Sequence, residues 1–199
     1  HRIDTDYGEV RFETSSSFCR VQSTSLAVLL ALLGCPVGNK SIQDYELPAW
    51  LFSARRWQKR LFLAAYFGAE LQTPRAYLKR NRNFPCPLLT LQKTTAFIAS
   101  GRRFLEQVTA LAGEFGVRTL GINERKEKVL RKYGTSSRLR LVFSSKPDNL
   151  IALYGRIGFE YNSKRRAEAA CVSAYQAMKK ASWNLRYSLA SEISRFRKA

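Results

Sequence analysis

Histidine is almost absent from this sequence of 199 residues. His1 is the only histidine, and it stands at the first position. An internal Ser-His-Asp triad and a Cys-His pair are therefore excluded, because both need a histidine beside the nucleophile. The sequence also lacks a P-loop and a dinucleotide-binding glycine motif. An enzyme built from this chain would have to work with carboxylates, lysines and a metal.

Paired cysteines and long apolar runs are also missing. Cys19, Cys35, Cys86 and Cys171 stand singly, without the spacing of a zinc site or a disulfide framework. We therefore expect buried, reduced cysteines in an intracellular protein. No run of about eighteen apolar residues is present, so the sequence predicts no transmembrane span and no membrane partner. A chain that does not begin with Met is typical of a processed product or of a piece of a longer protein.

Acidic residues are few beside the basic ones. The 15 Asp and Glu residues face 34 Lys and Arg residues, which gives a formal charge of +19. This excess indicates a polyanionic partner, with nucleic acid the natural candidate. An anionic membrane surface is a weaker candidate, because no long basic amphipathic stripe is present. A solvated basic surface with no partner is the remaining alternative.

Hydrophobic periodicity predicts an α+β protein. Alternating runs over 9–14 and 18–22 predict a β-hairpin, and 26–33 predicts a core helix that is capped by the serines and threonine before it. From residue 55 the predicted order is helix, two strands, helix, two strands, helix. The strands predicted in this part are 88–91, 117–123 and 138–143. The helices predicted in this part are 61–71, 101–116, 147–157, 164–180 and 183–198.

The predicted helix over 61–71 is apolar on nearly every face. Its small residues Ala64, Ala65 and Gly68 would let a second backbone approach closely, as a helix interface requires. Glu70 is its only charge and ends the hydrophobic run. A carboxylate buried there would be costly unless a cation or a metal neutralised it. The alternative is a core helix that ends in a solvated glutamate.

The stretch Leu63-Ala64-Ala65-Tyr66-Phe67-Gly68-Ala69-Glu70 resembles the LAGLIDADG motif of homing endonucleases, in the form carried by intein-borne members. Ala65 and Leu71 stand where the motif has glycines. Further similar landmarks, which extend the resemblance over 17–180, lie at 34–40, 47–50, 114–117 and 157–164. The resemblance implies an αββαββα saddle with an antiparallel sheet, made of one complete repeat and a partial one.

The resemblance also implies a division of the chain into three parts: a partial first repeat over 1–50, a complete LAGLIDADG-type repeat over 51–180, and a basic accessory helix over 181–199. A weak internal repeat agrees with it. Gly34 and Gly158 are 124 residues apart, and so are Leu26 and Leu150. The motif helix of the first repeat is not in this sequence.

The function implied by the resemblance is binding of double-stranded DNA and Mg²⁺-dependent cleavage of phosphodiester bonds. Glu70 would be the catalytic and metal-binding acid, and Lys146 would stabilise the developing charge. A second acid would come from a homodimer, or from a missing N-terminal half, that pairs through residues 61–70. The alternatives are an inactive nucleic-acid-binding relative of the RNA maturase kind and a ribosome- or RNA-associated protein. DNA is favoured over RNA as the partner. If Lys146 is not catalytic, its alternative role is phosphate contact or solubility.

A basic face on predicted strands is the binding surface that the residues themselves indicate. Arg138 and Arg140 alternate with Leu139 and Leu141, which predicts a half-buried strand with a cationic face. Arginine and lysine on strands bind phosphates and read purine edges. The predicted nucleic-acid-binding residues are Arg75, Lys79, Arg80, Arg82, Arg125, Lys126, Lys128, Arg138 and Arg140.

Overall fold

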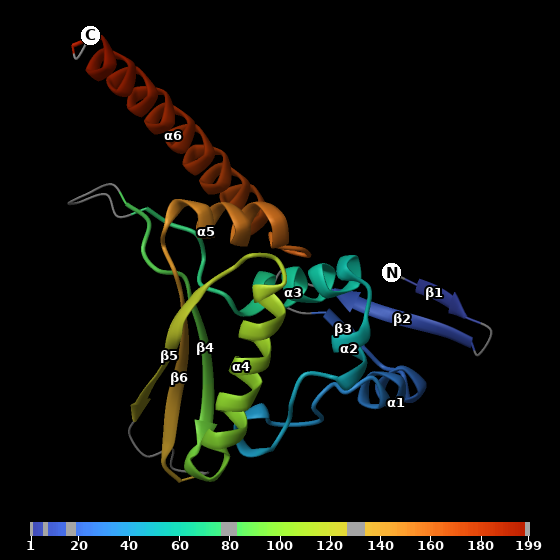
Figure 1. Ribbon diagram of the computed structural model, residues 1–199. Coiled ribbons are helices and arrows are strands. Elements are labelled where there is room, and N and C mark those ends of the chain that lie inside the picture. The colour runs from blue at the N-terminus through green and yellow to red at the C-terminus, as the bar shows by residue number, and fades with distance from the viewer. Residues whose placement is uncertain (1, 6–7, 15–18, 77–82, 127–133, 198–199) are drawn as a thin grey trace. The chain divides into compact units, whose positions relative to one another are not determined.

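The computed structural model describes residues 2–5, 8–14, 19–76, 83–126 and 134–197. The chain divides into two compact units, His1–Lys40 and Ser41–Ala199. Each unit has its own antiparallel sheet and at least one helix (Figure 1). The α+β class predicted from the sequence is therefore confirmed.

The first unit is a three-stranded sheet followed by a helix. β1 (Arg2–Thr5), β2 (Gly8–Thr14) and β3 (Cys19–Val21) pair antiparallel in this order. The hairpin predicted over 9–22 is confirmed, and a strand that the sequence did not predict precedes it.

The helix of the first unit, α1 (Thr24–Leu32), begins as predicted. The hydroxyl of Ser23 caps it by accepting a hydrogen bond of 3.2 Å from the backbone N–H of Leu26. No residue of α1 is buried, and Leu29 and Leu32 are 51% and 80% exposed. The helix expected in the core is therefore an exposed apolar helix.

The second unit is organised on a sheet of three strands, β4 (Leu88–Thr94), β5 (Thr119–Lys126) and β6 (Ser136–Phe143). β6 lies in the centre, antiparallel to both neighbours. Its alternating leucines Leu139 and Leu141 are fully buried under α4 (Ile98–Gly113), which packs on this face of the sheet (Figure 1). The close approach depends on Gly101, where a Cβ would lie 2.8 Å from the Leu139 side chain.

The strand order departs from the predicted saddle. α2 (Ala49–Ser53) and α3 (Arg56–Glu70) precede β4, and an isolated bridge joins Leu71 to Leu89. Within the described ranges, one strand rather than two lies between α3 and α4. The helical turns η1 (Lys40–Ile42) and η2 (Thr95–Phe97) complete the first half of this unit. The structure thus confirms the mixed class and the antiparallel sheet, and the αββαββα saddle is not confirmed.

The small residues of α3 are covered by the protein's own chain. The backbone N–H of Glu160 donates a hydrogen bond of 3.0 Å to the carbonyl of Ala64. A Cβ on Gly68 would collide with the carbonyl oxygen of Glu160. Ala64 and Gly68 are buried, whereas Ala65 is half-buried. The close backbone approach is thus made within the unit, and pairing of 61–70 with another copy or with a missing half stays a prediction.

The C-terminal part packs three helical segments together. α5 (Pro147–Ile151) runs into the π-helical segment η3 (Ala152–Ile157), which ends at Gly158 with a φ of +71°, as predicted. α6 (Ser163–Phe196) is one continuous helix where the sequence predicted two. In the described part of the chain, no helix has the length and apolar character needed to cross a membrane.

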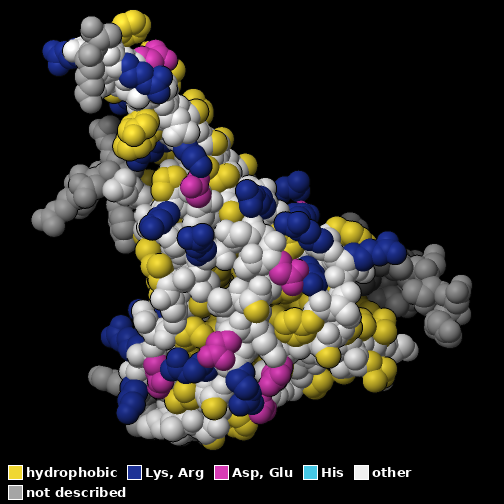
Figure 2. All heavy atoms as spheres, in the orientation of Figure 1, with side chains coloured by type: hydrophobic (Ala, Val, Ile, Leu, Met, Phe, Trp, Pro, Cys, Tyr) yellow, Lys and Arg dark blue, Asp and Glu magenta, His cyan; other side chains and the backbone are white. Residues whose placement is uncertain are grey.

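The three cysteines whose side chains the structure describes are less buried than expected. Cys35 and Cys171 are exposed free thiols, and Cys86 is a partly exposed one. Hydrophobic side chains also remain on the surface of α6, interspersed with Lys and Arg (Figure 2). Trp183 and Phe196 of this helix are 66% and 83% exposed.

Candidate nucleic-acid interface

The middle of the sheet face that points away from α4 is polar and cationic. Strand alternation places the neighbours of Leu139 and Leu141 on this face, and Arg138 and Arg140 are half-buried there. Strand register extends the face across the sheet in two rows. We call it the cationic sheet face, and it consists of the row Thr90, Arg140 and Asn123 and the row Gln92, Arg138 and Arg125.

Two arginines of this face stand directly opposite each other. Arg125 and Arg138 are register partners on β5 and β6, and like charges in this position destabilise a sheet. Glu124, next to Arg125 in the chain, is the register partner of Leu139 and so lies on the opposite face of the sheet. Glu124 accepts a hydrogen bond of 2.9 Å from the Ser137 hydroxyl and pairs with Arg102 of α4 at 3.6 Å. The carboxylate is thus engaged on the α4 side, and an anion bound to the cationic sheet face would offset the repulsion.

The other predicted binding residues are spread more widely. Arg75 is exposed after α3, and Lys126 is exposed at the end of β5. Lys79, Arg80, Arg82 and Lys128 lie outside the described residues. The structure therefore brings Arg125, Arg138 and Arg140 together on one face, and their role in binding stays a prediction.

Glu70 is exposed at the end of α3. Its charge acts on two tyrosines: burial first, and then the Glu70 carboxylate, raises the pKa of Tyr45 to about 12. Burial, Tyr45 and Glu70 together raise the pKa of Tyr66 as well. Among the described residues no three Asp, Glu, Cys or His side chains gather as a metal site would need. We therefore derive no chemical step through Mg²⁺, and the metal at Glu70 stays a prediction.

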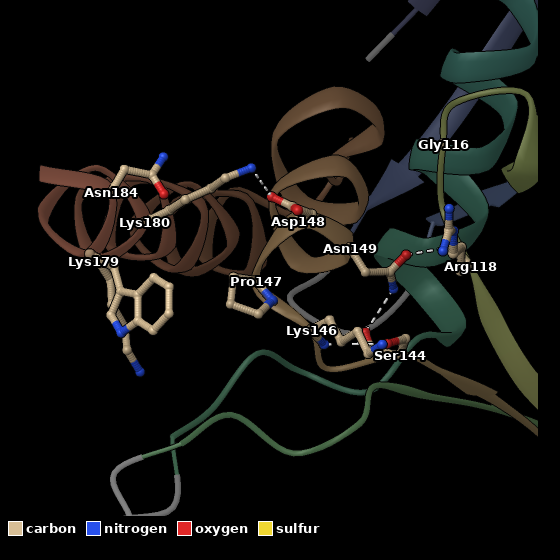
Figure 3. Close-up of a pocket in the computed structure, with 11 residues that line it drawn as sticks. Gly116, Arg118, Ser144, Lys146, Pro147, Asp148, Asn149, Lys179, Lys180 and Asn184 are labelled. Carbon is tan, nitrogen blue, oxygen red and sulfur yellow. Dashed lines mark hydrogen bonds and ion pairs between the residues drawn. The ribbon is translucent and has the colours of Figure 1, made fainter. Parts of the chain in front are cut away.

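Lys146 lies on a different element, at the residue before α5. It lines a pocket of about 710 Å³ between α5, α6 and the ends of β5 and β6, and Glu70 is not among the lining residues (Figure 3). Three further cations, Arg118, Lys179 and Lys180, line the same pocket. The sequence alone did not identify these three cations as members of one site. The spacing of Lys179, Lys180 and Trp183 along one helix face was the available signal.

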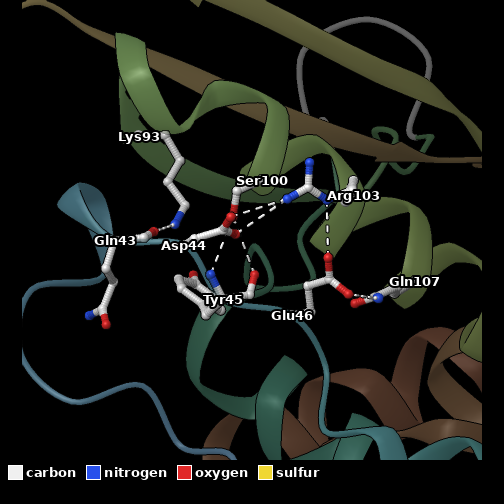
Figure 4. A network of polar contacts seen from close by, with 8 residues as sticks. All are labelled: Gln43, Asp44, Tyr45, Glu46, Lys93, Ser100, Arg103 and Gln107. Atoms are coloured by element: carbon white, nitrogen blue, oxygen red, sulfur yellow. Dashed lines mark hydrogen bonds and ion pairs between the residues drawn. The ribbon is translucent and has the colours of Figure 1, made fainter.

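A second polar cluster joins the segment before α2 to α4 and β4 (Figure 4). Arg103 bonds to Glu46 at 3.0 Å and to Asp44 at 3.2 Å. Gln107 donates to the Glu46 carboxylate at 2.9 Å and accepts from the Leu47 backbone N–H at 2.8 Å. The charges of this cluster are neutralised within the protein, so the cluster serves to hold the segment before α2 against α4.

Lys93 is the buried charged residue of the cluster (Figure 4). Its side chain is fully buried, donates to the Gln43 carbonyl at 2.7 Å, and lies 3.9 Å from the ring centroid of Tyr45. Burial lowers the pKa of Lys93 from 10.5 to about 8, and the Asp44 carboxylate opposes this shift. A carbonyl and an aromatic face together partly replace the water that the ammonium has lost.

Comparison with known proteins finds relatives with several different names. The chain is 33% identical to the tRNA-splicing ligase RtcB of Pyrococcus furiosus over 90% of this chain and 17% of that relative. It is 32% identical to the DNA-directed RNA polymerase subunit Rpo1N of Methanocaldococcus jannaschii over 86% of this chain and 12% of the relative. It is 26% identical to the replication factor C small subunit of the same organism over 91% of this chain and 9% of the relative.

The chain therefore spans less than a fifth of the length of each of these relatives. No family model matches it. No solved structure matches it either.

These findings contradict the resemblance to LAGLIDADG homing endonucleases. The relatives are named as a splicing ligase, a polymerase subunit and a replication factor subunit, so the endonuclease function and the intein-like assignment were wrong. The preference for DNA over RNA has no support in these names. Small residues along α3 have a sufficient local reason, because the Glu160 backbone packs against Ala64 and Gly68. The catalytic roles given to Glu70 and Lys146 stay untested predictions.

Proposed function

We propose that this chain is a nucleic-acid-binding module and that the cationic sheet face is its binding surface. The observation that carries the proposal is the apposition of Arg125 and Arg138 on a sheet face that also carries Arg140. Neither Arg125 nor Arg140 forms a side-chain hydrogen bond or ion pair with another described residue. Arginines placed in this way are available to phosphate oxygens.

The other members of the face support the same function. Gln92, Asn123 and Thr90 stand beside the arginines in register. Amide and hydroxyl side chains supply the neutral hydrogen bonds that accompany charged contacts to phosphates, sugars and base edges. The formal charge of +19 would add a long-range attraction that weakens with salt.

The relatives suggest the class of partner. Two of the three printed names refer to RNA, and the third refers to replication. Because these names describe different activities and the chain covers a small part of each relative, we assign none of those activities to it. Contact with nucleic acid is the common element, and RNA is the first partner to test.

The test is a binding titration of labelled RNA and DNA duplexes, followed by anisotropy at about 50 to 200 mM salt. The Arg138→Gln/Arg140→Gln variant should bind roughly 10- to 100-fold more weakly, and its salt slope should fall by about 2. The matched control is Arg102→Gln/Arg103→Gln, which removes the same charge from arginines that acids already neutralise. Its affinity should stay within about threefold of the parent.

Salt-sensitive binding that is lost only in the cationic-face variant supports the proposal. Absence of salt-dependent binding to either duplex would sink it. An equal loss in both double variants would also overturn it, since affinity would then follow net charge and not the cationic sheet face.

A further inference from the structure

The pocket lined by Lys146 has more positively charged side chains than acidic ones in its lining. Arg118, Lys146, Lys179 and Lys180 line it, and Asp148 is the only acid among the lining residues. Asp148 pairs with Lys180. Within the described chain, the side chains of Arg118, Lys146 and Lys179 form no hydrogen bond or ion pair with the protein. Three cations from three parts of the chain thus line one hollow without an acid of their own (Figure 3).

The floor of the pocket is rigid. Asn149 is 5% exposed, and both ends of its amide are engaged. Its oxygen accepts from the backbone N–H of Arg118, and its nitrogen donates to the carbonyl of Ser144 at 2.7 Å. The N–H of Ser144 in turn donates to the Arg118 carbonyl at 3.1 Å. These bonds hold the start of β5 and the end of β6 together, so the pocket exists before any ligand binds.

The opposite wall is a face of α6 that adds an aromatic ring to the cations. Lys179, Lys180, Trp183 and Asn184 line the pocket from one face of this helix. Trp183 is 66% exposed, and Tyr187 stacks nearly parallel to it at a centroid distance of 6.3 Å. The tyrosine thereby steadies an indole that still presents a large apolar surface. Such a ring is a stacking platform for a nucleobase.

We propose that this pocket binds a nucleoside phosphate, with the base against Trp183 and the phosphate on lining cations that include Lys179. The volume of about 710 Å³ is in the range of pockets that hold ligands of this size. The nucleotide is either free or part of a nucleic-acid strand. Only the second source rests on the proposed function, because a free nucleotide needs no contact with the cationic sheet face.

Fluorescence of Trp183 can test this proposal directly. In the Trp50→Phe/Trp57→Phe chain, Trp183 is the only tryptophan left, and the two replaced side chains are 44% and 58% exposed, so the fold should tolerate both changes. AMP should quench the emission saturably, and adenosine and inorganic phosphate should each bind at least about tenfold more weakly. A 5′-phosphorylated oligoadenylate identifies the source. Binding about tenfold tighter than AMP indicates a strand, and equal binding indicates a free nucleotide.

Variants assign the quenching to the pocket. Lys179→Met should weaken AMP binding about tenfold. Arg195→Met removes one positive charge from the same helix outside the pocket and should change it less than about twofold. The proposal is overturned by an emission that neither AMP nor the oligonucleotide changes, or by equal losses in the two variants. It is also overturned if an oligoglutamate peptide quenches as well as AMP, because the pocket would then recognise acidic protein segments.

Failure of this proposal can be told apart from failure of the proposed function. Arg138→Gln/Arg140→Gln should leave AMP quenching unchanged while duplex binding is lost. Quenching by AMP without duplex binding would refute only the proposed role of the cationic sheet face. Duplex binding without quenching would refute only the proposed nucleotide pocket.

Discussion

Two polar clusters of the second unit use the same residue types in opposite ways. In the cluster around Arg103, every charge named has an opposite charge or a hydrogen-bonding group within reach, and the result ties the segment before α2 to α4 (Figure 4). In the pocket around Lys146, three cations have none among the described residues (Figure 3). With 34 basic and 15 acidic residues, this chain has too few acids to give every cation a partner of its own. What an arginine or lysine does here depends on whether an acid stands beside it.

The largest effect on stability that we expect comes from the floor of the pocket. Its buried polar groups are hydrogen-bonded within the protein, as the charged groups of the Arg103 cluster are. Asn149→Ala leaves the N–H of Arg118 and the carbonyl of Ser144 without their buried partner. The free energy of unfolding should fall by about 3 kcal/mol. Asn184→Ala, at an exposed position of the pocket wall, should change it by less than about 0.5 kcal/mol. Urea unfolding of both variants measures the difference, and equal effects would show that the floor is not held by this amide.

The second expected effect is a dependence on pH from Lys93. Its pKa is lowered to about 8 in the folded chain and is 10.5 when unfolded. Between these values the unfolded chain holds the proton that the folded chain has released, so the free energy of unfolding should rise with pH. Lys93→Met should lose this rise. Urea unfolding of both proteins at about pH 7.5 and 9.5 tests it, below the range in which tyrosines ionise. Parallel slopes in the two proteins would contradict the lowered pKa.

The smallest expected effect is a difference in unfolding free energy between removing a cation that has an acidic partner and removing one that has none. Arg103→Gln breaks two ion pairs whose side chains are about half exposed, and should cost about 1 kcal/mol of unfolding free energy. Lys179→Gln breaks no described pair and should cost less than about 0.5 kcal/mol. At about 1 M salt the cost of Arg103→Gln should shrink. A larger loss from Lys179→Gln than from Arg103→Gln would remove the distinction between the two clusters.

A second comparison shows how burial depends on neighbours that the local pattern does not name. Leu29 of α1 and Leu153 of η3 stand at corresponding positions of the weak repeat. Leu153 is 1% exposed because η3 packs against α3 and α6, whereas Leu29 is 51% exposed. The apolar spacing predicted a helix correctly at both places. It could not predict burial, which depends on segments far away in the chain.

The resemblance at 63–70 failed for a related reason. Small residues on one helix face record that a backbone comes close, and they do not record whose backbone it is. In the structure it is that of Glu160, about 90 residues further along the same chain. The terminal Glu70 was assigned to a metal on the strength of the resemblance. That assignment stays a prediction, and in the structure the Glu70 carboxylate adds to burial in raising the pKa values of Tyr45 and Tyr66.

The sequence by itself determined the α+β class, the hairpin before α1, the positions of α4 and β6, and the cationic face with Arg138 and Arg140. Each depends on periodicity within a few residues, because alternation and helical spacing decide which side chains share a face. Only the tertiary structure decided that Arg125 stands opposite Arg138, and that Arg118, Lys146, Lys179 and Trp183 line one pocket. Apart from Lys179 and Trp183, which share a face of α6, these residues are distant in the chain, and strand register and helix packing bring them together.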